Sequence, residues 1–161
     1  MSVYLPVFSA LAKANARYVI VGGLAVVMHG HSRLTADVDI VVDLDPDEAR
    51  RAVQALVDLG LKPRAPVNPL DFAEPQIRRQ WIEEKGLQVF SFWDPVHPLR
   101  AVDIFTEHPI PFDDLWKRAV DVDLGGVHVR IASKADLILL KEKSGRDVDL
   151  EDIRALRNLQ D

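Results

Sequence analysis

A run of β-branched and aromatic residues, Arg17–Val21, ends at the pair Gly22-Gly23. Such a run predicts a β-strand, and the glycines predict its end. The residues Leu24–His29 then predict a short helix, and Asp37–Val42 predicts a second strand. A strand that turns through glycines into a helix, with another strand close behind it, requires a sheet on which helices pack.

The rest of the chain adds helices and strands in an order typical of an α+β fold. Asp45-Pro46 can begin a helix that runs to Leu59, and Gly125-Gly126 can join two strands as a tight hairpin. Hairpins in place of steady β-α-β alternation favour a mixed or antiparallel sheet with helices packed on it. We expect one domain over residues 1–161, ending in a short helical pair at about 133–159. The other expected elements are strands over 87–93, 99–105, 120–124 and 127–131, a helix over 112–118, an irregular stretch over 62–75, and either a helix or a strand over 76–84.

The composition excludes several classes of site and of protein. Cysteine is absent, which excludes disulfides, thiolate metal sites and a cysteine nucleophile. The net charge of −5 argues against a general nucleic-acid coat protein. No apolar run approaches the ~20 residues that cross a bilayer, and the N-terminal segment is too polar for a signal peptide. We therefore expect a cytoplasmic protein with no membrane partner.

Asp37-Val38-Asp39 and the glycines upstream carry the predicted chemistry. Side chains alternate along a strand, so Asp37 and Asp39 lie on one face while Val38 can enter the core. Two neighbouring carboxylates raise each other's pKa unless a cation neutralises them, and hard oxygen ligands suit Mg²⁺ or Mn²⁺. The Gly22-Gly23 turn offers backbone N–H groups at a helix N-terminus, where phosphate binds. Together these features predict a nucleotide–metal site.

Asp103 is the candidate for a third carboxylate, because it is the lone acid in the apolar run Ala101–Phe105. A third acid commonly completes a two-metal arrangement. Each feature also has a structural explanation: a simple turn, a solvated strand face, or an aspartate paired with a lysine or arginine. Asp121-Val122-Asp123 shows the same pattern without a glycine turn upstream, and we interpret it as a solvated face. The order and spacing of the motifs favour the functional interpretation of the first set.

Five segments of the chain carry a resemblance to a known superfamily: Val19–Ala25, Arg33–Asp39, Val102–Ile104, Ser133–Lys141 and Gly145–Asp152. They resemble the minimal nucleotidyltransferase domain of the DNA polymerase β-like superfamily. Its signature is a glycine-rich turn, a helix, Asp-x-Asp on the next strand and a third Asp on a later strand. More closely, the chain is similar to the AbiEii-type nucleotidyltransferases of bacteria and archaea and to their single-domain relatives.

The resemblance implies transfer of a nucleoside monophosphate from an NTP to a hydroxyl with release of pyrophosphate, ATP being the expected nucleotide. It implies that Asp37 and Asp39 hold the metal of the triphosphate. Asp103 would help to bind a second metal and bring the acceptor oxygen into line. Gly22 and Gly23 would contact phosphate through their backbone. Many members of the superfamily have Gly-Ser at this turn, and the second glycine here removes a hydroxyl contact.

Four basic residues are candidates for contact with the nucleotide or the acceptor. Lys134, Lys141 and Arg146 belong to the C-terminal segments, and Arg33 lies just before the Asp-x-Asp strand. Lys134 and Lys141 are seven residues apart, so they lie nearly two turns apart on one helix face. The alternative for the lysines is a solvated, salt-bridged surface, and the alternative for Arg33 is a structural ion pair.

Other residues near these motifs keep two interpretations. Asp149 and Asp152 either orient the lysine helix or are ordinary acids at a helix start. The spacing of His29 and His31 does not fit a usual zinc pair, so we expect a capping or packing role for them. The tryptophans are expected in the core or on edge strands, with base stacking left open for one of them: Trp81, Trp93 and Trp116.

The acceptor and the biological setting follow only from the resemblance. Related enzymes in toxin–antitoxin systems modify tRNA or a partner toxin, so the expected acceptor is RNA, tRNA in particular, or protein. Only about 30 residues follow Ser133, whereas larger toxins of this type carry a substantial additional helical region. A macromolecular acceptor would therefore need a homodimer, a cognate toxin or antitoxin, or an open groove. The alternative function is a catalytically silent nucleotide-binding or partner-binding module, and the presence of all three aspartates favours the enzyme.

Overall fold

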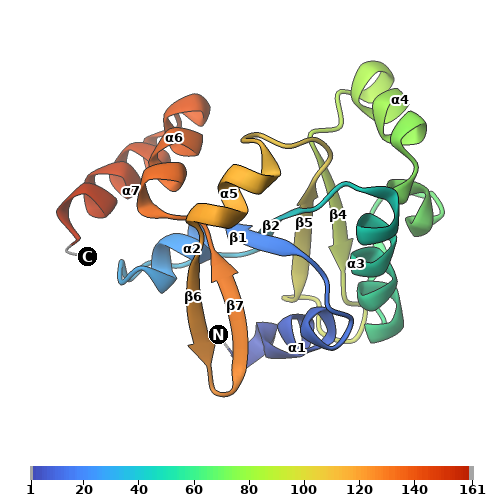
Figure 1. Cartoon of the computed structure of the whole chain (residues 1–161), viewed down its shortest axis with the longest axis horizontal. Helices are drawn as coiled ribbons and strands as arrows, with labels where there is room; N and C mark the ends of the chain where they lie inside the picture. Colours follow the sequence, from blue (N-terminus) through green and yellow to red (C-terminus); the bar gives the residue numbers. More distant parts are fainter. Residues whose placement is uncertain (1, 160–161) are drawn as a thin grey trace.

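A mixed sheet of seven strands forms the centre of the molecule, in the order β3-β4-β5-β2-β1-β7-β6 (Figure 1). The structure, a computed structural model, describes residues 2–159. Met1, Gln160 and Asp161, at the ends of the expected domain, lie outside the described residues. The strands are β1 (Tyr18–Val21), β2 (Val38–Val42), β3 (Lys62–Pro63), β4 (Val89–Trp93), β5 (Ala101–Phe105), β6 (Val120–Leu124) and β7 (Val127–Ile131).

Helices surround this sheet in two groups. α1 lies beside α3, while α6 pairs with α7 on the other side of the molecule, next to α2 (Figure 1). No helix in the described part of the chain is long and apolar enough to cross a bilayer. The helices are η1 (Ser2–Tyr4), α1 (Leu5–Lys13), α2 (Gly22–Met28), α3 (Pro46–Leu59), η2 (Pro69–Ala73), α4 (Pro75–Lys85), α5 (Phe112–Arg118), α6 (Lys134–Ser144) and α7 (Asp147–Asn158).

The register of the central strands brings two aspartates side by side. β2 is antiparallel to β1 and parallel to β5, and Asp39 of β2 lies opposite Asp103 of β5. β4 is antiparallel to β5, with Ser91 opposite Asp103. On the other face of β2 and β5, Ile40 and Ile104 are fully buried, whereas Asp39, Ser91 and Asp103 are half-buried. This part of the sheet therefore has one face in the core and one face open at the aspartates.

The observed elements confirm the α+β expectation with its mixed sheet and C-terminal helical pair. Local signals fixed many of the boundaries. The Asp45 side chain accepts a hydrogen bond from the N–H of Asp47 at the start of α3, and Gly60 ends that helix with a left-handed backbone. Ser133 caps α6 in the same way, by accepting from the N–H of Asp136 at 3.1 Å.

Several details differ from the sequence prediction. β2 begins at Val38, so Asp37 precedes the strand instead of opening it. The segment left open between helix and strand is the helix α4, and the expected irregular stretch contains the short elements β3 and η2. Asp147, a residue type that often caps a helix, is instead the first residue of α7. Arg146 is the N-cap, and its N–H donates to the Asp149 carboxylate at 3.2 Å.

Candidate active site

Asp39 and Asp103 form a carboxylate pair on the open face of the sheet. Their Cα atoms are register partners on neighbouring parallel strands, which places them about 4.8 Å apart. Asp37 lies two residues before Asp39 and is also half-buried. Each strand thus contributes its acid at the same level of the sheet, a placement that the sequence patterns alone left open.

The environment of this pair disfavours its ionised form. Burial raises the pKa of Asp39 to about 7, with further contributions from the charges of Asp103 and Asp37 and an opposing one from Lys141. Burial also raises the pKa of Asp103, against a hydrogen bond from Ser91. The two carboxylates repel each other at a partly desolvated site. A cation bound there would therefore favour the ionised forms of Asp39 and Asp103.

Replacement of Asp39 by asparagine tests this electrostatic cost in the metal-free protein. The folded-state pKa of Asp39 lies above the unfolded value, so the folded wild type holds a proton that the unfolded chain loses. The free energy of unfolding of the wild type should therefore fall as pH rises from about 4 to about 7. Asp39→Asn should remove this loss and be more stable at pH 8 by about 1–2 kcal/mol. Urea unfolding in EDTA at pH 5 and pH 8 measures the free energy of unfolding of wild type and of Asp39→Asn. The same change between the two pH values in both proteins would contradict the prediction.

The donor set suits a cation that arrives with its substrate. In residues 2–159, no three histidine, aspartate or glutamate side chains are gathered closely enough to hold a metal ion by themselves. Mg²⁺ commonly binds one or two carboxylates and completes its shell with substrate phosphates and water. The Asp39–Asp103 pair and the nearby Asp37 fit that pattern, and they do not form a preformed cage.

The glycine turn fits closely around the aspartate and a basic side chain. Gly22 has a left-handed backbone (φ +69), and a Cβ there would lie 2.2 Å from the Oδ2 atom of Asp39. A Cβ at Gly23 would lie 2.6 Å from Nη2 of Arg33 and 3.0 Å from Oγ1 of Thr35. The turn is therefore glycine because protein groups approach it, in addition to any phosphate contact through its N–H groups.

Gly22→Ala should displace the Asp39 carboxylate and impair activity. Gly125→Ala is the matched control, because Gly125 has nearly the same backbone (φ +65) but nothing within 4 Å of its added Cβ. We expect the control to cost about 1 kcal/mol of stability from backbone strain alone. Gly22→Ala should cost at least twice that and lower the transfer rate by about tenfold or more. Thermal unfolding and a transfer assay on both variants would show this, and equal behaviour would contradict it.

A buried network of charges ties the C-terminal helices to the loop before β2. Asp152 is fully buried and lies 2.8 Å from the Nζ of Lys141 and 2.9 Å from the Nε of Arg33. Asp149 is also buried and lies 2.9 Å from the Nε of Arg146 and 3.4 Å from Lys141. Burial alone would raise the pKa of Asp149, but hydrogen bonds from Arg146 and the charge of Lys141 hold it well below its usual range.

These contacts bear on the interpretations that the sequence left open. Lys141 is not part of a solvated surface, because its side chain is buried among aspartates. Arg33 forms the structural ion pair that was its alternative role, and Asp152 orients the lysine helix. Lys134 is half-buried, with its Nζ 3.4 Å from the carbonyl oxygen of Leu159.

Two pockets are lined by the aspartates of the Asp-x-Asp pattern, one by Asp39 and the other by Asp37. We call the first the Asp39 pocket; it has a volume of about 180 Å³ and is lined by Asp39, Gly22, Lys141 and Arg146 together with apolar residues of β4, β5 and α6. The second, the Asp37 pocket, has a volume of about 450 Å³ and is lined by Asp37 and by residues of η1, α2, β5 and three loops. The first brings two basic residues, Lys141 and Arg146, to the same pocket as the glycine turn, and it also contains the carboxylates of Asp39 and Asp149.

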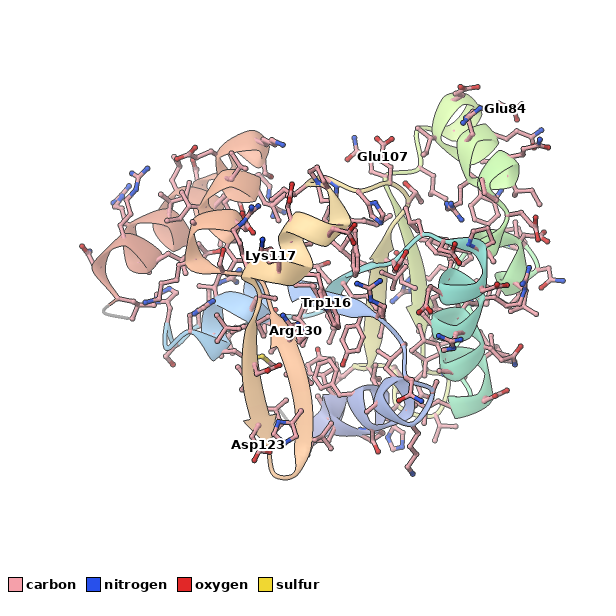
Figure 2. All side chains as sticks on the ribbon, in the orientation of Figure 1. Glu84, Glu107, Trp116, Lys117, Asp123 and Arg130 are labelled. Carbon is pink, nitrogen blue, oxygen red and sulfur yellow. The ribbon has the colours of Figure 1, made fainter. Side chains whose placement is uncertain are left out.

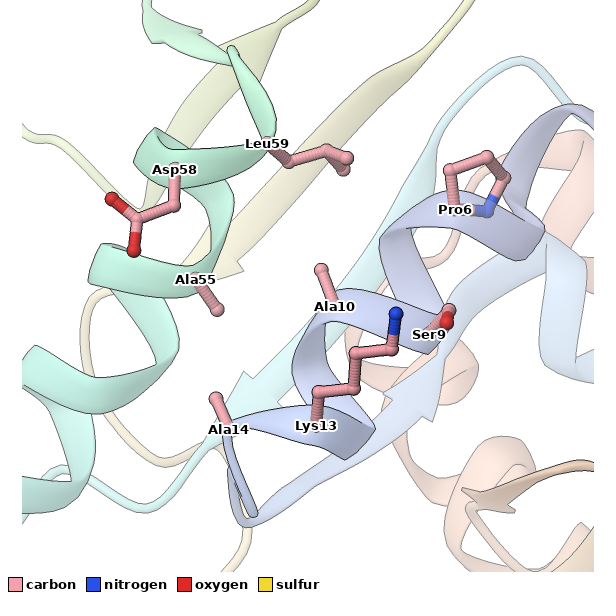
Figure 3. Close-up of a pocket in the computed structure, with 8 residues that line it drawn as sticks. All are labelled: Pro6, Ser9, Ala10, Lys13, Ala14, Ala55, Asp58 and Leu59. Atoms are coloured by element: carbon pink, nitrogen blue, oxygen red, sulfur yellow. The ribbon is translucent and has the colours of Figure 1, made fainter.

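A larger groove elsewhere contains none of the predicted site residues. It lies between α1 and α3 and has a volume of about 510 Å³ (Figure 3). Ala10 and Ala14 face Ala55 across it, and Lys13 and Asp58 are at its rim. Small apolar walls without clustered polar groups give this groove no evident chemistry.

The second Asp-x-Asp pattern has the structural role predicted for it. Asp121 and Asp123 are exposed on β6, and Asp123 lies near the turn of the β6–β7 hairpin (Figure 2). Asp121 lies 3.6 Å from Arg130, and Asp123 accepts a hydrogen bond from the N–H of Gly126 at 2.7 Å. Arg130 in turn lies 4.3 Å above the ring of Trp116 (Figure 2). These carboxylates stabilise a hairpin and its flank.

Sequence reasoning missed three residues near the aspartates. Ser91 hydrogen-bonds to Asp103. The sequence feature that could have identified Ser91 is a single hydroxyl residue within an otherwise aromatic strand. Tyr4 donates a hydrogen bond to the carbonyl of Ala36, and burial together with the charges of Asp37 and Asp39 raises its pKa. Arg64 lies close enough to Asp103 to lower its pKa, and no local pattern marked it.

Comparison with known proteins places the fold among known structures. Several solved structures share the fold at low sequence identity. The lincosamide antibiotic adenylyltransferase LnuA, bound to lincomycin, has a TM-score of 0.67 and 17% identity over 99% of this chain and 98% of its own. ANT(2″)-Ia in complex with adenylyl-2″-tobramycin has a TM-score of 0.61 and 12% identity over 96% and 87% of the two chains. An antigenic nucleotidyltransferase-like protein from Paracoccidioides brasiliensis has a TM-score of 0.59 and 16% identity over 92% and 71%.

No protein with a curated description matches the sequence. A family does match, over residues 7–159, and its description is "Nucleotidyltransferase of unknown function (DUF6036)". The match includes the glycine turn, all three aspartates and the C-terminal helical pair. The chain therefore belongs to the DUF6036 family of nucleotidyltransferases.

Proposed function

We propose that this nucleotidyltransferase moves a nucleoside monophosphate from an NTP, with ATP the expected nucleotide, to a hydroxyl, in a reaction that depends on Mg²⁺ or Mn²⁺. The observation that carries the proposal is the in-register pair Asp39–Asp103 beside the Gly22 turn. Asp37, Asp39 and Asp103 would hold the cation, which neutralises charge on the triphosphate oxygens when bound.

The chain's own residues divide the remaining tasks. The acceptor oxygen bonds to the α-phosphorus, the bond to the β-phosphate breaks and pyrophosphate leaves. Asp103 orients the acceptor hydroxyl and takes its proton, and Ser91 fixes the Asp103 carboxylate. Gly22 and Gly23 offer backbone N–H groups to phosphate.

The basic residues act at different distances from the nucleotide. Arg146 lines the Asp39 pocket with a side chain that is 71% exposed and is bonded to Asp149 on one side, so it can contact the triphosphate from the rim of the pocket. Lys141 lines the same pocket but is held by Asp149 and Asp152, so it contributes its positive charge from a fixed place. We retain Lys134 and Arg33 as nucleotide-binding candidates. Lys134 would act by stabilising α6, and Arg33 by stabilising the loop before β2.

The acceptor and the setting extend this proposal. The expectation from the resemblance is an RNA, tRNA in particular, or a protein acceptor in a toxin–antitoxin setting of AbiEii type, with a homodimer or a cognate toxin or antitoxin as partner. The neighbours LnuA and ANT(2″)-Ia, described with lincomycin and adenylyl-tobramycin, support small molecules as a second acceptor class. We further propose that residues 1–161 act as one cytoplasmic domain.

Label transfer tests the function directly. The full chain is incubated with ATP labelled at the α-phosphate, Mg²⁺ or Mn²⁺, and separate pools of tRNA, protein and small molecules from a cell extract. Label in an acceptor pool and release of pyrophosphate are expected, and EDTA should abolish both. Pyrophosphate release no greater than that of Asp37→Ala/Asp39→Ala would overturn the enzymatic proposal. Calorimetry with a non-hydrolysable ATP analogue would then show whether the chain is a silent nucleotide-binding module.

A further inference from the structure

The Asp37 pocket has exposed apolar residues beside a catalytic aspartate. Leu34, on the loop before β2, is 94% exposed, and Leu99, on the loop between β4 and β5, is 82% exposed. Both line the same pocket as Asp37, together with Leu24 and Val27 of α2. Single exposed leucines are ordinary on protein surfaces. Two exposed leucines from separate loops around one pocket form an apolar surface that a ligand can cover.

The two pockets differ in the chemistry they offer. The Asp39 pocket has the glycine turn, Lys141 and Arg146, which suit the negative charges of a triphosphate. The Asp37 pocket is mostly apolar and has two guanidinium groups, of which Arg33 is held by Asp152. The two aspartates are two residues apart, about 6–7 Å along the chain. Molecules bound in the two pockets therefore meet at the carboxylates.

We propose that the Asp37 pocket is the acceptor subsite and that the acceptor is a small molecule with a hydroxyl on an apolar body. This inference rests on the proposed function and names its substrate class. The hydroxyl lies at Asp37 and Asp103, where its oxygen attacks the α-phosphorus, its proton passes to the Asp103 carboxylate and pyrophosphate leaves. The apolar body lies against Leu34 and Leu99 and removes them from water.

Size and charge favour a small acceptor over RNA. The pocket volume of about 450 Å³ lies within the range that small-molecule sites occupy. Sites for single-stranded RNA combine a continuous cationic groove with stacking aromatic rings. Here the lining is mostly aliphatic, with one aromatic ring and two guanidinium groups around an aspartate, in a chain of net charge −5. One ring and two arginines beside a carboxylate do not form such a continuous cationic, stacking groove.

A matched pair of variants tests the pocket. Leu34→Ser/Leu99→Ser removes the apolar lining, while Val96→Ser is the control, because Val96 is 79% exposed on the same loop as Leu99 but does not line the pocket. The probe is anilinonaphthalene sulfonate, an apolar anion whose fluorescence reports binding. We expect the double variant to bind it at least about tenfold more weakly than wild type, and the control to stay within about twofold. Calorimetry with an ATP analogue and Mg²⁺ should give one affinity for all three proteins.

The outcomes separate this inference from the proposed function. Unchanged probe binding in the double variant, or an equal loss in Val96→Ser, would overturn the acceptor subsite while normal ATP binding left the function standing. Absence of ATP binding from wild type would overturn the function itself and the subsite with it. In the transfer assay, label in the small-molecule pool that falls at least tenfold in the double variant supports the inference. Label confined to tRNA or protein overturns it.

Discussion

Replacement of Asp37 and Asp39 by alanine is expected to lower the rate of nucleotide transfer by about 10³-fold or more, the largest effect on activity that we predict. Asp39 lies opposite Asp103 in the sheet, and Asp37 lines the Asp37 pocket. Without them, one carboxylate would remain to hold a cation against the triphosphate. The measurement is pyrophosphate release at saturating ATP and Mg²⁺, with thermal unfolding to show that the variant folds.

The chain contains its own control for this experiment. Asp121→Ala/Asp123→Ala makes the same chemical change in the same sequence pattern, on an exposed strand far along the sheet. Its rate should stay within about twofold of wild type, because surface carboxylates of this kind contribute little. A comparable loss in both double variants would mean that net charge, and not the position of the first pair, governs the rate.

Asp152→Ala is expected to give the largest loss of stability, about 3–5 kcal/mol. Asp152 is fully buried between Lys141 and Arg33, and its removal leaves two basic groups beside each other without their shared partner. The cost comes from the uncompensated charge, because a buried ion pair gains little over a well-packed apolar pair. Chemical unfolding at pH 7 measures it. Activity should fall as well, since Arg33 lies beside Gly23.

Glu142→Ala is the matched control, because Glu142 forms an exposed pair with Arg157 that joins the same two helices, α6 and α7, at 3.0 Å. It should change the free energy of unfolding by less than about 1 kcal/mol. If the two variants lost equal stability, the network around Asp152 would be no more than a surface contact, and its proposed link to the glycine turn would fail.

The parts of the fold that follow local rules could be predicted from the sequence. Gly125-Gly126 fixed a hairpin, Ser133 fixed a helix start, and alternation placed Asp39 opposite a buried face. What local rules cannot supply is which strands become neighbours. The pairing of Asp39 with Asp103 depends on β5 lying next to β2, and those two strands are far apart in the sequence.

The buried lysine shows what the sequence left undetermined about the site. Lys141 lies on the same helix face as Leu137, which is fully buried, so the periodicity of α6 already placed the lysine toward the interior. The charge of the side chain favoured a surface position when taken alone. The partners that make burial tolerable, Asp149 and Asp152, belong to the next helix, and their contact became visible only when α6 and α7 were seen to pack together.

The two edges of the sheet have a consequence for how copies of this chain can associate. One edge, β3, is only two residues long and ends in Pro63, which has no N–H to offer a further strand. The other edge, β6, has the carboxylates of Asp121 and Asp123, which disfavour pairing with a second, identical strand. Neither edge is suited to extend the sheet into another molecule. Any dimer of this protein should therefore form through helices or loops, and its sheet should resist the edge-to-edge growth that leads to fibrils.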